Sequence, residues 1–427
     1  MREPDLADTD RDLRRELHRH PEPAWCEFYT TSRLIDELEQ RDVDEIHYGA
    51  EIHGDTRRNV PDADTLAGWR ERAREAGAPD AVLDHIGDGY TGAVAVVDRG
   101  SGPTVALRVD IDALPITEAE SDDHHPAAAG FRSTNEGYMH ACGHDAHATI
   151  GLGVLDRVLD SDFAGTFKLI FQPAEETISG GRSIADSGVL DDVDRLLALH
   201  IGLDHPSGEV VAGIDEFLAV RQFEATFRGE SAHAGARPED GDNAVQAMAA
   251  AVQNLYGIPR NSAGGTRVNA GRVGGGTASN IVPEEAFIDG EVRGETTALM
   301  EYMWDRAENV FSGAATMHNC AVDIERLGDA PSAHSDAALV DVVDRVARRT
   351  AGVDHVVDHD SLGGSEDATY LMQRVQKRGG LAAYVGVGTD HPGGHHTPTF
   401  DVNERDIAVG IDLIAGVVID LAADETG

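Results

Sequence analysis

The sequence of 427 residues is long enough for two domains, and its 41% of apolar residues suits a globular protein. It contains no run near the roughly 18 apolar residues of a membrane-spanning helix, and its charged N-terminus lacks the apolar centre of a signal peptide, so we expect a cytoplasmic protein. The net charge of −42, with Lys168 and Lys377 as the only lysines, predicts a halophilic protein from a salt-rich cytoplasm and argues against nucleic acids and membranes as partners.

Helices and strands alternate through the first half of the chain. Apolar spacing predicts two amphipathic helices within Asp10–Glu39, with a break near Pro21 and Pro23, and a polar insertion at Tyr48–Asp88 that contains one helical segment. Further along we expect strands at Gly92–Val97, Thr104–Asp110, Phe167–Phe171 and Arg195–His200, a helix at Ala148–Leu159, and near the C-terminus a strand at Ala382–Val387. Such alternation predicts a mostly parallel α/β sheet, which carries its functional groups at the carboxyl ends of its strands.

The pattern changes in the region 217–327. Its expected order is a strand, a helix, two strands, a helix and a strand, at Gln222–Phe227, Asn243–Leu255, Thr266–Val273, Glu285–Arg293, Thr297–Ala314 and Ala321–Arg326. This βαββαβ order is typical of a separate two-layer domain. We therefore expect one domain formed by residues 1–216 and 328–427, with residues 217–327 inserted into it.

The run Met139–His147 holds a thiol, several imidazoles and a carboxylate within nine residues. Thiolate and imidazole bind first-row divalent ions, and the Cys-x-His spacing of Cys142 and His144 lets both reach one ion from a tight turn. A histidine-rich surface loop is the alternative. The three cysteines are too few and too scattered for a disulfide framework, and Cys142 would have to stay reduced, which also favours the cytosol.

Three other segments offer ligands at predicted strand ends, namely Glu175–Glu176, His200 and His395–His396. Taken singly, they could be a solvated acidic pair, a core histidine and a polar turn. Their coincidence with Cys142 and His144 at the ends of one sheet favours a site for two divalent ions, which polarise a carbonyl and lower the pKa of a water. One glutamate of the pair can bind metal while the other acts as general base.

Two aspartates follow another predicted strand. Asp110 and Asp112 could orient a metal-bound imidazole by hydrogen bonding, or could serve only as caps. The sequence leaves both roles open.

Four motifs resemble those of the di-metal aminoacylase/carboxypeptidase amidohydrolase family, in order along nearly the whole chain. They are Leu107–Pro115, Met139–Asp145, Phe171–Glu176 and Ala232–Gly235. Within the family, the likeness is strongest to the A-type subunits that hydrolyse p-aminobenzoyl-glutamate. It rests on Gly229–Gly241, Gly364–Thr369 and the insertion at Tyr48–Asp88.

The resemblance implies a metallopeptidase-like catalytic domain with an inserted ferredoxin-like α+β lid or dimerisation domain. It also implies two divalent ions, manganese or zinc, with Cys142 in the bridging position and Glu175 as general base. The ligands that it implies are Cys142, His144, Glu176, His200 and His396. Asp112 is our candidate for a residue that orients these ligands.

The inserted domain contributes further residues by resemblance. His233 matches a histidine that supports the oxyanion in the partner protomer, which implies a homodimer through the lid domain. Asn280 and Arg293 match lid residues near the substrate carboxylate, and the planar fork of Arg293 suits that task. A B-type partner subunit is a further possibility that the resemblance raises.

The function expected from these features is metal-dependent hydrolysis of the amide bond of an N-acyl amino acid, with p-aminobenzoyl-glutamate as the first candidate substrate. Two alternatives remain. The first is a general N-acyl-amino-acid deacylase, acting on hippurate-like or indole-acetyl-amino-acid-like substrates, or a dipeptidase with the same metal chemistry. The second is a non-catalytic metal-binding homologue, which the presence of Glu175 disfavours.

Overall fold

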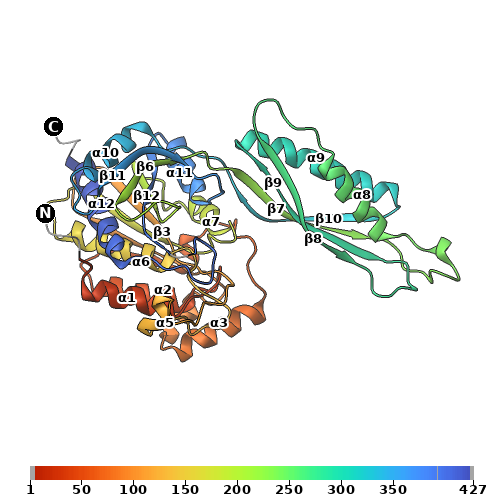
Figure 1. The fold of residues 1–427 in the computed structure, drawn as a ribbon, viewed down its shortest axis with the longest axis horizontal. Helices are drawn as coiled ribbons and strands as arrows, with labels where there is room; N and C mark the ends of the chain where they lie inside the picture. The colour runs from red at the N-terminus through yellow and green to blue at the C-terminus, as the bar shows by residue number, and fades with distance from the viewer. Residues whose placement is uncertain (1–4, 392, 424–427) are drawn as a thin grey trace. The chain divides into compact units, whose positions relative to one another are not determined.

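The computed structural model describes residues 5–391 and 393–423, which form two compact units (Figure 1). Unit 1 comprises the chain up to Asp215, Ala333–Leu362 and the chain from Asp367 onward, and unit 2 comprises Glu216–Ser332 and Gly363–Glu366. The chain returns from unit 2 to unit 1 after Ser332, a few residues beyond the expected boundary at 327. The reason is that the last strand of unit 2, β10 (Ala321–Ala330), is longer than its apolar pattern indicates.

Unit 1 is built on an eight-stranded sheet with the order β1-β2-β4-β3-β5-β12-β6-β11. Its strands are β1 (Glu45–Tyr48), β2 (Ala93–Asp98), β3 (Thr104–Asp110), β4 (Thr166–Gln172), β5 (Arg195–Ile201), β6 (Glu209–Asp215), β11 (His355–Ser361) and β12 (Leu381–Val387). The central strands β4, β3, β5 and β12 are parallel, while β2 pairs antiparallel with β4, and β6 antiparallel with β12. The expected mostly parallel sheet is confirmed.

Helices flank this sheet (Figure 1). They are α1 (Asp8–Arg19), α2 (Phe28–Glu39), α3 (Ala63–Glu75), α4 (Asp80–His85), α5 (His125–Ala129), α6 (His144–Leu159), α7 (Gly180–Ser187), α10 (Ala337–Ala347), α11 (Ala368–Lys377) and α12 (Glu404–Ala423), with a 3-10 turn at Gly49–Ile52. The helical segment expected in the insertion corresponds to α3.

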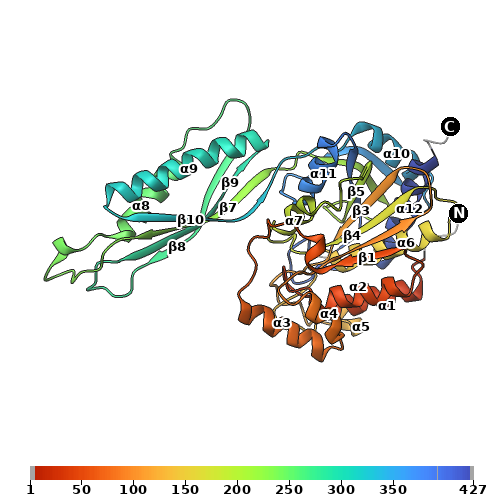
Figure 2. The same ribbon diagram turned by 180° about the vertical axis from the view of Figure 1, so that it is seen from behind.

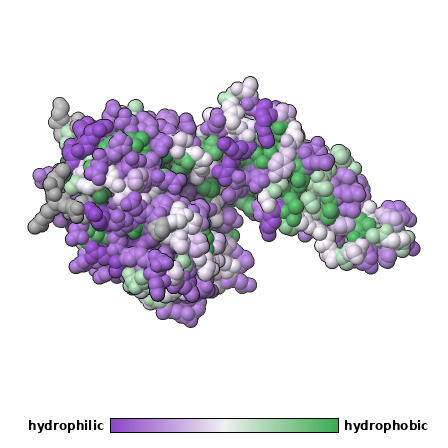
Figure 3. Space-filling view, viewed as in Figure 1, coloured by the Kyte–Doolittle hydropathy of each residue, from purple (hydrophilic) through white to green (hydrophobic). Residues whose placement is uncertain are grey.

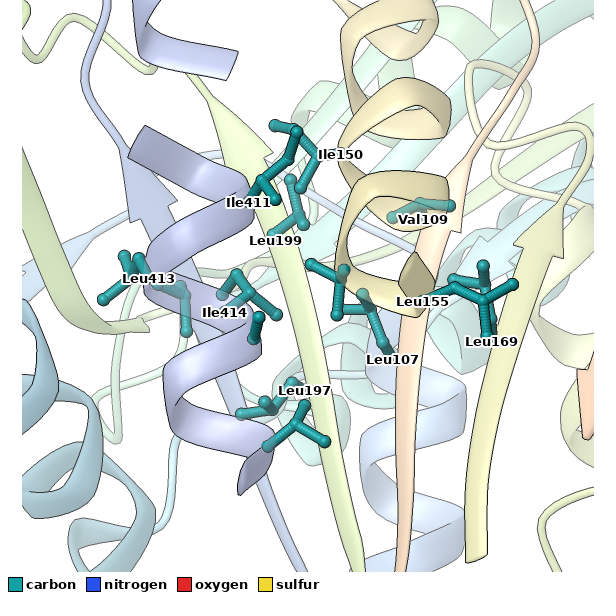
Figure 4. Close-up of a cluster of buried hydrophobic side chains, with 14 of the residues drawn as sticks. Leu107, Val109, Ile150, Leu155, Leu169, Leu197, Leu199, Ile411, Leu413 and Ile414 are labelled. Carbon is teal, nitrogen blue, oxygen red and sulfur yellow. The ribbon is translucent and has the colours of Figure 1, made fainter. Parts of the chain in front are cut away.

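The packing of α6 and α12 on the sheet forms the main core, drawn in Figure 4. Leucine, isoleucine and valine side chains of the two helices meet those of β3, β4 and β5, and each such burial contributes roughly 1.5–3 kcal/mol. The helices approach closely at Gly153, where an added Cβ would lie 2.4 Å from Cδ1 of Ile411. This packing fixes the first turn of α6, which begins at His144, against the sheet.

Four features of unit 1 differ from expectation. Strands β1, β6 and β11 were not predicted, and α6 begins at His144 rather than at Ala148. Strand β1 is only four residues long inside a polar stretch, and β11 is an edge strand whose charged, mostly exposed residues show no apolar pattern. The first turn of α6 was missed because its residues are the histidines and the aspartate of the motif.

Unit 2 has a four-stranded antiparallel sheet with the order β10-β7-β9-β8. Strands β7 (Ala219–Arg228), β8 (Thr266–Gly275), β9 (Glu285–Gly294) and β10 alternate with helices α8 (Ala244–Tyr256) and α9 (Thr297–Met317). Both helices lie on one face of the sheet (Figure 2), over a core that includes Phe223, Trp304 and Phe311. This is the expected ferredoxin-like arrangement.

Polar residues cover most of the face drawn in Figure 3, in keeping with the acidic composition. Among the described residues, no helix has both the length and the apolar character needed to cross a bilayer.

Candidate metal centre

The central parallel strands of unit 1 bring the predicted ligands to one edge of the sheet. His200 lies near the end of β5, Glu175 and Glu176 follow β4, and His396 lies in the segment after β12. Cys142 and His144 lie at the start of α6. Because parallel strands end at the same edge, residues far apart in the sequence meet there.

Two groups of potential ligand atoms share the sulfur of Cys142. In each group the ligand atoms all lie within 4.8 Å of one another, and the groups are Cys142 with His144 and His200, and Cys142 with Glu176 and His396. A carboxylate oxygen of Glu175 lies within the same limit of His144 and Glu176. The structure therefore brings together all five predicted ligands and the predicted base, with the thiol common to both groups.

The backbone around Cys142 is held by contacts from distant segments. Gly143 has a φ of +90°, and a Cβ at this position would lie 2.8 Å from Cγ2 of Ile201, so the left-handed turn and the close packing both need glycine. The backbone N–H of His396 donates to the carbonyl of Ala141 at 2.9 Å. That bond fixes the segment bearing His396 to the loop bearing Cys142.

His144 is buried among carboxylates. Its Nδ1 lies 3.3 Å from Oδ1 of Asp112, and its Nε2 lies 3.6 Å from Oδ1 of Asp110 and 3.8 Å from Oε1 of Glu176. Burial opposes a charge on the ring, but these carboxylates outweigh it and raise the pKa of His144 to about 10. Neither ring nitrogen has a hydrogen-bond partner within the described part of the chain. A buried imidazole whose ring nitrogens make no hydrogen bond suits a cation ligand once the ring has lost its proton.

Asp112 lies beside both groups of ligands. It is buried, and its Oδ2 accepts the backbone N–H of Glu176 at 3.0 Å. Its other oxygen faces His144, as described above. Asp112 thus contacts two predicted ligands from outside the cluster.

The two glutamates follow a strained turn. Ala174 has a φ of +57°, which is uncommon for a residue with a Cβ, and its N–H donates to Oε1 of Glu27 at 2.8 Å. Burial, and then the charge of Asp112, raise the pKa of Glu27 well above its usual value. The carbonyl of Ala174 accepts the N–H groups of Ser179 and Gly180, both at 3.1 Å. These bonds hold the turn that presents Glu175.

The position of the ring proton in two buried histidines follows from the groups that face their ring nitrogens. His200 has Nδ1 2.8 Å from the carbonyl of Ile201, so Nδ1 carries the proton and Nε2 offers a lone pair. His147 shows the opposite pattern, because its Nε2 accepts the N–H of Ile201 at 2.9 Å and its Nδ1 donates to Asp110 at 2.5 Å. His200 is therefore suited to bind an ion through Nε2, whereas both nitrogens of His147 are engaged.

Asp110 is held in place from two sides. Arg108, fully buried, donates to its Oδ2 at 2.9 Å, and His147 donates to its Oδ1. Burial opposes ionisation, but His144, His147 and Arg108 hold the pKa of Asp110 well below its usual range.

Unit 2 contains the three predicted residues of the inserted domain. His233 is exposed, and its Nδ1 accepts the N–H groups of Gly235 and Ala236 at 3.1 and 3.0 Å, so its proton is on Nε2. The carbonyl of Asn280 accepts the N–H of Ala234 at 2.9 Å, which places these two loops side by side.

Arg293 is already paired within unit 2. Its Nε and Nη2 donate to the two carboxylate oxygens of Glu291 at 2.7 and 2.9 Å, and its Nη1 donates to Ser365 at 3.2 Å. A substrate carboxylate would have to take the place of Glu291.

Several residues that shape the site had no role predicted from the sequence. Glu27 carried no signal, because it lies far from the motifs in the sequence. His147 lay inside the histidine-rich run and His395 inside the His395–His396 pair, but spacing alone does not distinguish a ligand from a supporting histidine. What distinguishes the two roles is the group that faces the ring nitrogen pointing away from the site, and that group is placed by the tertiary structure.

The chain matches known proteins over most of its length. Residues 106–420 match the model of "Peptidase family M20/M25/M40". Over 407 residues, covering 94% of this chain and 93% of each relative, it is 43% identical to the indole-3-acetyl-aspartic acid hydrolase of Enterobacter agglomerans and 41% identical to the A subunit of p-aminobenzoyl-glutamate hydrolase from Escherichia coli (strain K12).

A solved structure supports the same assignment. The aminobenzoyl-glutamate utilization protein from Klebsiella pneumoniae superposes with a TM-score of 0.84 at 38% identity, covering 97% of this chain and 96% of that one. The expected resemblance to di-metal amidohydrolases is thus confirmed at the level of the family. The chain belongs to peptidase family M20/M25/M40 and is an amidohydrolase.

Proposed function

We propose that this protein hydrolyses the amide bond between an aromatic acyl or aryl group and an acidic amino acid, with p-aminobenzoyl-glutamate as the first candidate substrate. The observation that carries the proposal is the sharing of Cys142 by two groups of ligand atoms, with Glu175 beside them. The relatives named above support the substrate class, since the names of two of them join an aromatic group to aspartate or glutamate.

The donor set fits two divalent cations. Cys142, His144, Glu176, His200 and His396 would hold them, and the buried ring nitrogens of His144 support this assignment. When bound, such a pair polarises the substrate carbonyl and lowers the pKa of a water. Thiolate favours zinc, whereas carboxylate and imidazole also suit manganese, so both metals are candidates.

Glu175 would act as the general base. It takes a proton from the attacking water and transfers it to the amide nitrogen as the C–N bond breaks. His233, whose proton is on Nε2, would donate a hydrogen bond to the oxyanion. Asn280 and Arg293 would bind the substrate carboxylate. To do so, Arg293 would release its hydrogen bonds to Glu291 and donate to the substrate carboxylate instead.

Unit 2 also supports a homodimer. Strand β8 is an edge of its sheet, and the large apolar side chains that are exposed among the described residues all belong to this unit. They are Tyr256, Val273, Ile281 and Met317. Pairing of two copies along β8 would cover part of Val273, which is 47% exposed. In such a dimer we propose that His233 serves the partner's site.

We also propose a B-type partner subunit and a salt-rich cytoplasmic setting for this chain. The name of the relative from Escherichia coli makes it the A subunit of its enzyme, which supports a search for a B-type partner of this chain. A metal-binding thiolate at Cys142 needs a reducing compartment, and we infer the cytoplasm. The acidic composition supports a halophilic protein.

A substrate panel combined with metal analysis tests the proposal. The full chain, loaded with manganese or zinc, should bind two ions per chain. It should hydrolyse p-aminobenzoyl-glutamate or indole-3-acetyl-aspartate with a higher kcat/KM than hippurate or dipeptides. Equal values across the panel would instead favour a general deacylase. Two bound ions without hydrolysis of any of these amides would favour a non-catalytic homologue.

A further inference from the structure

Two histidines face the sulfur of Cys142 at nearly equal distances. Nε2 of His200 lies 3.4 Å from Sγ, and Nδ1 of His395 lies 3.5 Å from it. Distance therefore does not distinguish their roles. The ring nitrogen that points away from the sulfur does distinguish their roles. A ring nitrogen that faces a carbonyl must carry a proton, and one that faces an N–H must not.

His395 presents a proton to the sulfur. Its Nε2 accepts the backbone N–H of Leu203 at 2.9 Å, so Nδ1 carries the hydrogen. His200 has the reverse arrangement, since its Nδ1 faces a carbonyl and its Nε2 therefore offers a lone pair. Two imidazoles at one sulfur thus have opposite characters, one suited to bind an ion and one suited to donate a hydrogen bond.

The fold fixes the ring of His395 closely. The ring centroid lies 4.7 Å from that of Phe400 and 5.1 Å from that of His391. On the side of Nε2, Gly202 has a φ of +92°, and a Cβ there would lie 2.5 Å from Nε2. Leu203, whose N–H defines the tautomer, is itself left-handed with a φ of +52°. The strained segment and the missing Cβ together leave room for this orientation.

We propose that His395 is a positioning residue that donates an N–H···S hydrogen bond to the Cys142 thiolate and thereby weakens its donation to the bound cations. The inference rests on the proposed metal site. Hydrogen bonds to a metal-binding sulfur withdraw electron density from it and tune the metal. A less basic thiolate is a less soft ligand, so the bond moves the preference of the site away from zinc and toward manganese.

Cobalt reports directly on the sulfur, because a thiolate bound to Co²⁺ gives a charge-transfer absorption whose energy rises as the sulfur becomes a weaker donor. The full chain is stripped of metal, loaded with Co²⁺, and compared with His395→Phe, which keeps an aromatic ring but removes the N–H. We expect the absorption to move to longer wavelength in the variant. The ratio of zinc to manganese affinity should also rise, on the order of tenfold.

Two further variants separate hydrogen bonding from packing. His391→Phe alters a ring that contacts His395, and it should leave both the absorption and the affinity ratio unchanged. Gly202→Ala should shift the absorption as His395→Phe does, because the added methyl group must displace Nε2. Thermal unfolding of each metal-free protein checks that it is folded.

Two results would overturn the inference. One is a charge-transfer band in the wild type that does not move in His395→Phe, and the other is an equal shift in His391→Phe. Absence of the band from the wild type would instead overturn the proposed metal site itself, so the two failures are distinguishable.

Discussion

The side chain of Asp112 accepts a hydrogen bond from the backbone N–H of Glu176 at 3.0 Å. Its second oxygen lies 3.3 Å from Nδ1 of His144, so one carboxylate contacts a predicted ligand from each of the two groups that share Cys142. The relative position of these groups therefore depends on Asp112.

Replacing Asp112 with asparagine should weaken metal binding. One oxygen can still accept the N–H of Glu176, but a neutral NH₂ group then faces Nδ1 of His144 in place of a carboxylate oxygen, so the ring loses the charge contact that orients it. We expect the affinity for Mn²⁺ or Zn²⁺ to fall by about 10–100-fold, measured by competition with a chelator. Asp64→Asn, on the exposed face of α3, is the control and should bind as the wild type does. If Asp112→Asn binds metal with wild-type affinity, the carboxylate acts only as the acceptor for the backbone N–H of Glu176.

Replacing Glu175 with glutamine should separate catalysis from metal binding. The variant keeps the size of the side chain but cannot accept a proton from water, so kcat should fall by roughly 10² or more. The metal content should stay at the wild-type value, because the five ligands are intact. Both kcat and metal content are measured on the same preparation of the variant and compared with those of the wild type. Unchanged turnover would mean that another group is the base.

Metal loading should release protons. In the metal-free protein the pKa of His144 is about 10, so the ring is protonated at pH 8 and must lose its proton when an ion binds. The apparent affinity should therefore decrease as the pH falls below 10, and calorimetry in buffers of different ionisation enthalpy should detect at least one proton released per chain. No release at pH 8 would show that His144 does not bind the metal.

The sequence predicted most of the fold and which candidate ligands lie together, because both depend on local patterns. The valine-rich and leucine-rich strands β3 and β5 have clear apolar runs, and several candidate ligands lie at or just after the ends of the central strands. Edge strand β11 was missed, because its exposed and charged residues have no reason to show that pattern.

The roles of individual histidines were less predictable. His147 and His200 are both buried at the site, yet one accepts the N–H of Ile201 and the other faces the carbonyl of the same residue. This difference depends on how β5 meets α6 in space, and no spacing in the sequence encodes it. The support that Glu27 gives to Ala174 is likewise a contact between segments 147 residues apart.

A buried ionic cluster beneath α6 should make stability depend on pH. His18 is fully buried, with Nδ1 2.7 Å from Asp145 and Nε2 2.9 Å from Glu118. Burial opposes its charge, but hydrogen bonds and charges of these carboxylates raise its pKa to about 9. Because this value exceeds that of an unfolded histidine, about 6.5, the stabilisation is complete below pH 6.5 and is lost as the pH rises through 9.

The free energy of unfolding of the metal-free protein should therefore fall between pH 6.5 and pH 9, by on the order of 3 kcal/mol from this group. Denaturant unfolding of His18→Gln should show a flatter dependence over the same range. His47→Gln, which changes a partly exposed histidine at β1, should retain the wild-type slope. Parallel curves for wild type and His18→Gln would contradict the assignment of a charged His18.

Salt should stabilise the protein and improve substrate binding. The chain carries 77 acidic and 35 basic residues, so its surface repels both itself and an anionic substrate in dilute buffer. Raising the ionic strength from 0.1 to 1 M shortens the Debye length from about 10 to about 3 Å, which screens exposed charges. Buried pairs such as Arg14 with Asp145, 3.0 Å apart, are screened much less and should keep their contribution.

KM should consequently fall and the unfolding midpoint should rise as KCl increases, while kcat changes less because the buried centre is less screened. Sucrose at equal osmolality is the control, since it stabilises folded proteins without screening charge. If sucrose reproduces the fall in KM, the effect is not electrostatic. If activity is highest in dilute buffer, the dense carboxylate surface is not an adaptation to salt, because a surface selected for screening cannot work best where screening is weakest.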